Sequence, residues 1–156
     1  MTVPPALLIT GPSVYIHPRV LANQDWVDLP GQASLVDGIP PGRAMILGEV
    51  RDCDDVRLQH ATVNASPAPD FAHPAYFGPG NDEHMVPDPA QALHGTGPSG
   101  GYALLSLAPG AVRVSAGGYA QDGAYTVVGT HAVATFADSV TFVTFRGLSP
   151  WQYQTP

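Results

Sequence analysis

The chain has no lysine, a single cysteine and only two glutamates among its 156 residues. Six dispersed arginines stand against 13 acidic residues, which gives a net charge of −7. Such a chain repels phosphate groups, so nucleic acid and anionic membrane surfaces are not expected as partners. Cys53 has no second cysteine with which to form an internal disulfide. Its neighbours Asp52 and Asp54 should raise the pKa of the thiol, which favours a structural or intermolecular role over nucleophilic catalysis.

Long hydrophobic runs are missing as well. Residues 4–10 form an apolar stretch that is too short to span a bilayer, so no membrane insertion is expected. Residues 1–2 supply no positively charged region of the kind that opens a signal peptide. The sequence leaves the compartment open, and an extracellular or cell-envelope location is favoured if a leader has been removed.

Glycine and proline are abundant, with 17 of each, and 44% of the residues are hydrophobic. This combination predicts many turns, few long helices and a buried core, as in an all-β domain with long loops. We expect an extended lead-in over residues 1–43, packed on a β-sandwich domain over 44–148. The sandwich carries a loop insertion at 66–98, and a short tail follows at 149–156. Within the lead-in, residues 18–27 predict a short helix that begins at a proline.

Apolar residues recur with period two in several segments, which predicts β-strands. The clearest segment is 100–116, where two such runs flank a Pro-Gly turn. Segments 44–52 and 57–63 flank an Asp-rich turn and predict a β-hairpin. Further strands are expected over 125–136 and 140–145. Because both faces of the last strand are apolar, it should be covered on both sides, as an inner strand or at a subunit contact.

A series of short motifs then follows in order: Gly48-x-Val50-x-Asp52, Ala61-Thr62-Val63, Ser99-Gly100-Gly101-Tyr102, Leu107-Ala108-Pro109-Gly110 and Val112-x-Val114-x-Ala116. Together they resemble the carboxypeptidase regulatory-like domain, and the resemblance covers roughly residues 44–120. It implies a seven-stranded transthyretin-like (prealbumin-like) β-sandwich. It also implies a non-catalytic accessory role in adhesion, assembly or support of another protein. The insertion at 66–98 and the lead-in depart from the family pattern.

The insertion gathers histidine and carboxylate side chains that are suitable ligands for zinc or non-haem iron. The candidate metal site consists of His73, His84 and His94, with Asp82 as a fourth ligand. The spacing matches no established short metal-binding motif. The alternative therefore stays open that these histidines face solvent or bond to the local backbone. If a metal is bound, an oxidative or hydrolytic enzyme is the corresponding hypothesis.

Candidate interaction residues are the large aromatics Tyr76, Phe77, Trp151 and Tyr153. Such side chains contact proteins or sugars when exposed, and close the ends of a sandwich when buried. The sequence contains no recognised catalytic motif. It therefore favours a non-catalytic β-sandwich that contacts a protein partner or self-associates as a homo-oligomer. A metal-dependent enzyme and a carbohydrate-binding module are the alternatives.

Overall fold

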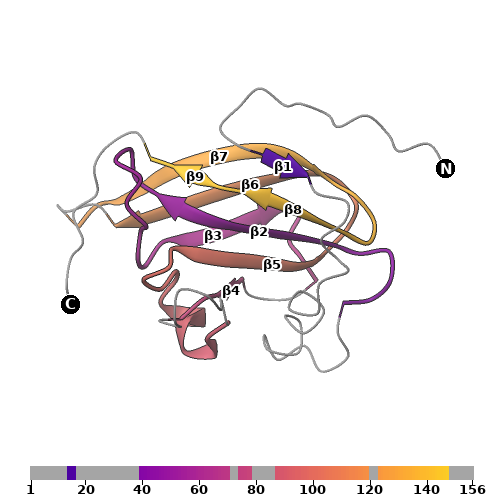
Figure 1. Ribbon diagram of the computed structural model, residues 1–156, viewed down its shortest axis with the longest axis horizontal. Coiled ribbons are helices and arrows are strands. Elements are labelled where there is room, and N and C mark those ends of the chain that lie inside the picture. Colours follow the sequence, from indigo (N-terminus) through magenta and orange to yellow (C-terminus); the bar gives the residue numbers. More distant parts are fainter. Residues whose placement is uncertain (1–13, 17–38, 71–73, 79–86, 120–122, 148–156) are drawn as a thin grey trace.

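The chain folds into two β-sheets that pack against each other (Figure 1). The computed structural model describes residues 14–16, 39–70, 74–78, 87–119 and 123–147. The larger sheet has six strands, in the order β1-β8-β2-β5-β4 with β9 paired to β2, and the smaller sheet has the order β3-β6-β7. This confirms the all-β prediction. The strands are β1 (Val14–Ile16), β2 (Ala44–Arg51), β3 (Thr62–Ser66), β4 (Ala75–Tyr76), β5 (Gly101–Leu107), β6 (Gly110–Tyr119), β7 (Tyr125–Thr135), β8 (Ser139–Val143) and β9 (Phe145–Arg146).

Strand β2 organises the larger sheet because it has neighbours on both sides. It pairs antiparallel with β5, and parallel with β8 and β9. Its side chains alternate between two apolar layers: Ile46 and Val50 face the smaller sheet, while Met45 and Leu47 belong to a second cluster. All four side chains are buried, so the near-continuous apolar run of β2 is that of an inner strand.

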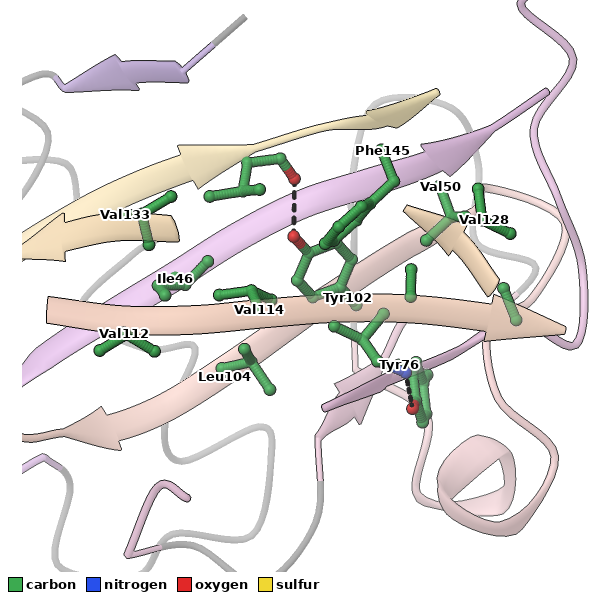
Figure 2. Packing of buried hydrophobic residues seen from close by; sticks show 14 of the residues in the cluster. Ile46, Val50, Tyr76, Tyr102, Leu104, Val112, Val114, Val128, Val133 and Phe145 are labelled. Carbon is green, nitrogen blue, oxygen red and sulfur yellow. Dashed lines mark hydrogen bonds between the residues drawn. The ribbon is translucent and has the colours of Figure 1, made fainter. Parts of the chain in front are cut away.

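The main core lies between the two sheets (Figure 2). Ile46 and Leu104 from the larger sheet belong to the same fully buried cluster as Val63 and Val114 from the smaller sheet. Period-two alternation directs these side chains into one layer, because successive residues of a strand point to opposite faces. Removal of this apolar surface from water is the main force that holds the two sheets together.

Two buried tyrosines satisfy backbone groups inside this core (Figure 2). The Tyr102 hydroxyl donates to the carbonyl oxygen of Val143 at 2.6 Å. The Tyr76 hydroxyl accepts from the amide of Val63 at 2.9 Å, which joins β4 of the larger sheet to β3 of the smaller sheet. Burial raises the pKa of both phenols, so both stay neutral at physiological pH.

Strand β8 confirms the prediction that residues 140–145 are covered on both faces. It lies inside the larger sheet between β1 and β2. Val143 belongs to the main core, whereas Val140 belongs to the second cluster, against which Phe142 packs. The predicted strand is interrupted at residue 144 and continues as β9.

The two predicted strand-turn-strand segments contain the expected strands, but the strands of each segment lie in different sheets. β5 pairs with β2 and β4, whereas β6, which follows the Pro-Gly turn, pairs with β3 and β7. β2 and β3 are separated in the same way, so the β-hairpin predicted over 44–63 is wrong. Near the Asp-rich turn the chain reverses only through a bridge between Arg51 and Arg57. Both turns therefore carry the chain from one sheet to the other.

Other predictions fall partly or wholly outside the described residues. The helix expected over 18–27 and the tail at 149–156 lie outside them. From the lead-in, β1 pairs with β8 and extends the larger sheet. From the insertion, the structure shows β4 and the short 3-10 helix η2 (Pro89–Leu93), whose first turn is capped by Asp88. Within the ranges given above, no helical segment has the length and hydrophobicity that crossing a bilayer requires.

Candidate functional site

The structure describes one of the four residues of the candidate metal site, His94. It ends helix η2, and its carbonyl oxygen lies 3.3 Å from Nδ1 of His60. His73, Asp82 and His84 lie outside the described residues. Among the residues that are described, no group of three or more His, Cys, Asp or Glu side chains is arranged to hold a metal ion. The zinc or iron site stays a prediction.

Two of the four predicted interaction residues belong to the core. Tyr76 is 3% exposed and lies in the layer between the sheets, and Phe77 is 1% exposed and lies in the second cluster beside Leu105. These two rings therefore form no accessible surface, which corrects the prediction for Tyr76 and Phe77. Trp151 and Tyr153 lie outside the described residues.

The Asp-rich turn is held by its own backbone, as expected for aspartate at a turn. One Asp52 carboxylate oxygen accepts from the amides of Asp54 and Val56 at 2.9 and 2.8 Å. Partial desolvation, followed by the carboxylates of Asp54 and Asp52, raises the pKa of the exposed Cys53 thiol. The direction of this shift is the one that the sequence predicts, and it keeps the thiol protonated at neutral pH.

Ion pairs connect this turn to the larger sheet. Asp55 pairs with Arg51 and Arg146, and Glu49 pairs with Arg51 and lies 3.6 Å from Arg57. Although partial desolvation opposes the shift, the two guanidinium groups lower the pKa of Asp55. Three arginines that are dispersed in the sequence thus lie together in space. Each is paired with a carboxylate, so they form no free basic patch for a polyanion.

Two pockets are lined by described residues. One lies beside Arg43 and Asp138 and the other between Val63 and Leu104, with volumes of about 130 and 150 Å³. Sites for small organic molecules usually have volumes of about 300–1,000 Å³. The Arg43 guanidinium already donates to Asp70 and to the Ser106 carbonyl. These two pockets therefore lack the size and the free polar groups of a substrate site.

Strand β7 is the longest strand in the described part of the chain, and five of its 11 residues are exposed. It forms one edge of the smaller sheet, where β6 covers one side of it and no described strand covers the other. Its 11 residues include no proline and no Asp, Glu, Lys or Arg. Natural edge strands are usually short or are protected by charges and prolines, and β7 has neither protection.

Exposed apolar side chains extend this edge where β6 meets β7. Tyr119, Tyr125 and Val127 are 64%, 51% and 62% exposed, and the two tyrosine rings meet edge to face with centroids 5.3 Å apart. The Tyr125 ring lies over Gly117, where a Cβ atom would overlap the phenol, and its hydroxyl lies 2.7 Å from the Thr62 hydroxyl. We call Tyr119, Tyr125 and Val127 the β7 patch. The patch could not be predicted from the sequence, because these residues occupy ordinary strand positions.

No family model, curated protein or solved structure matches this chain. The fold and the surface define an all-β domain with two sheets. Within the described residues, its smaller sheet has a long uncovered edge, β7, on which exposed apolar side chains of the β7 patch lie.

Proposed function

We propose that this chain is a non-catalytic β-sandwich module that acts through contact with a protein surface, and that β7 and the β7 patch make the contact. The observation that carries the proposal is an 11-residue edge strand without Asp, Glu, Lys or Arg, on which Tyr125 and Val127 are exposed. The unpaired N–H and C=O groups of such an edge can receive a further strand, so main-chain hydrogen bonds supply affinity and side chains supply selectivity.

We further propose that the domain has the transthyretin-like arrangement that its sequence motifs suggest. In support, the motif residues Gly48 and Val50 lie on β2, Tyr102 lies near the start of β5, and Gly110 begins β6 after the turn between the sheets. The short strands β1, β4 and β9 add to the longer ones and bring the described strands to nine. This arrangement implies that the chain is an accessory module of an extracellular or cell-envelope protein.

The contact proposal is tested by affinity capture with tagged protein and identification of what is retained. Val127→Lys places a charge in the β7 patch without changing a buried side chain. Asn64→Lys places the same charge at an exposed position of β3 and is the matched control. We expect a partner, either another protein or untagged copies of this chain, to be retained by the wild type and the control and lost by Val127→Lys. Equal retention by all three proteins would show that β7 is not the contact.

A further inference from the structure

We infer that the occupant of the β7 edge is a second copy of this chain, whose own β7 pairs antiparallel with it across a two-fold axis. The two smaller sheets, with three strands each, then form one continuous sheet. The inference rests on the proposed contact function and names the partner. Antiparallel pairing follows from the symmetry, because strands related by a two-fold axis perpendicular to the sheet run in opposite directions.

The backbone of β7 has one side still available. Its ladder to β6 runs from Thr135 opposite Gly110 to Tyr125 opposite Tyr119. Among the described residues, none of the backbone hydrogen bonds outside the ladders involves a residue of β7. An added strand would pair these N–H and C=O groups directly, as the strands of the sheet already do.

The side chains beside this edge allow a strand to approach. A bulge at Val128 interrupts the ladder, since Gly129 lies opposite Ala116 while Val127 lies opposite Gly117. Beyond the bulge, residues 129–135 are regular, and their exposed side chains, Thr130 and Ala132, are small. Neighbouring strands lie only about 4.8 Å apart, so small residues leave the edge open to a second backbone.

The other edge strands of the two sheets are less suited to pair with an added strand. β1 and β4 have three and two residues, and β3 has five. β3 ends at Ser66 and is followed by Pro67 and Pro69, which have no N–H group to donate. β7 alone among the described edge strands combines length with a complete set of backbone donors and acceptors.

Charge favours this edge as the place where two copies meet. Each copy carries a net charge of −7, so two copies repel each other at most orientations. β7 contributes no carboxylate, and Arg113 of β6, opposite Ala132, brings a positive charge close to the edge. Arg113 has no ion pair within the described residues, so its charge is available to reduce the repulsion.

The test combines mass measurement with matched lysine variants. Thr130→Lys with Ala132→Lys charges the β7 edge, and Asn64→Lys with Ala111→Lys adds the same charge to exposed positions of β3 and β6. We expect light scattering to show a dimer for the wild type and the control. We expect the β7 variant to dissociate at least about tenfold more readily, since lysine is the residue that most often blocks edge pairing. Circular dichroism confirms that every variant is folded.

Hydrogen exchange then locates the contact. Protection of β7 amides should rise with protein concentration, while protection of β3 amides stays constant. A wild type that is monomeric at every concentration, or a dimer that survives both lysines in β7 or leaves the β7 amides unprotected, overturns the inference. If the wild type is monomeric but Val127→Lys still loses a captured protein, self-pairing fails and the proposed contact function stands. If no partner depends on Val127, Thr130 or Ala132, both fail.

Discussion

The Tyr102 hydroxyl supplies a hydrogen bond to the larger sheet at a place where the backbone pairing of β2 is interrupted. β2 pairs with β8 as far as Leu47 and pairs again with β9 from Val50. In the gap, the carbonyl oxygen of Val143 accepts from the Tyr102 hydroxyl at 2.6 Å, and both residues are fully buried. A buried carbonyl that loses its donor keeps the full cost of its desolvation.

Tyr102→Phe removes this donor and leaves the ring in place. We expect the free energy of unfolding to fall by about 1–3 kcal/mol, because the Val143 carbonyl has no water to replace the phenol. Tyr125→Phe is the control, since its hydroxyl is on the exposed face and water can replace it. Urea denaturation measures both variants. Equal losses of unfolding free energy for the two variants would show that the buried hydrogen bond of Tyr102 stabilises the fold no more than the exposed one of Tyr125.

Gly48 is required at the same gap, where the pairing of β2 changes from β8 to β9. A Cβ atom at this position would overlap the carbonyl oxygen of Val143, which belongs to the backbone and cannot rotate away. We expect Gly48→Ala to cost at least about 3 kcal/mol or to abolish folding, as overpacking against a fixed backbone does. In Gly129→Ala the new methyl group meets a ring carbon of Phe145 at 3.2 Å, which a small ring movement relieves. Thermal unfolding should therefore show a much smaller loss for Gly129→Ala.

The strands could be located from the sequence, but their pairing could not. Alternation is a local property, so the strands at 101–107 and 125–135 follow from their own residues. Pairing depends on which sheet a turn leads to, and both the Pro-Gly turn and the Asp-rich turn lead across the core. Alternation alone does not distinguish such a crossing from a hairpin. The two-residue strand β4 was missed because it is too short to show a period.

Strands β7 and β9 are linked by a ring contact that includes the titratable side chain of His131. The His131 ring stacks on Phe145 with centroids 4.9 Å apart. Partial burial lowers the pKa of His131 from its ordinary value of 6.5. The unfolded chain therefore binds the proton more readily than the folded chain, so the free energy of unfolding decreases as the pH falls below 6.5.

His131→Gln should remove this part of the pH dependence, because glutamine does not titrate. Urea denaturation of the wild type and the variant at pH 7.5 and pH 5 measures the difference. The carboxylates and the other histidines are common to both proteins, so they cancel in the comparison. The interpretation fails if the wild type and the variant lose the same stability between the two pH values.

The candidate site could be predicted less well than the fold, because it depends on which strand lies at an edge. The aromatic residues selected in the insertion, Tyr76 and Phe77, are buried by the short strand β4 and the bridge that follows it. The β7 patch arises only because β7 has a neighbour on one side alone. The apolar faces of 140–145 could be predicted because they follow from alternation within one segment.

The net charge of the whole molecule sets how salt acts on the proposed dimer. Two copies at −7 repel each other, and salt screens this repulsion, whereas the backbone hydrogen bonds of a strand pair carry no net charge. We therefore expect the dimer to become tighter as sodium chloride rises from low to moderate concentration. Sedimentation equilibrium measures the dissociation constant at each salt concentration. An interface formed by ion pairs would weaken over the same range.

Arg113→Glu sharpens this test, because it places a negative charge beside each edge and makes each copy more acidic. It should weaken the dimer most at low salt and approach the wild type at high salt, where the added repulsion is screened. Gln59→Glu with Asn64→Glu makes the same change of charge at exposed positions away from β7 and is the control for net charge alone. Arg113 lies on the strand next to β7, opposite Ala132, so its effect at low salt should be the larger of the two. Equal effects would place the contact away from this edge.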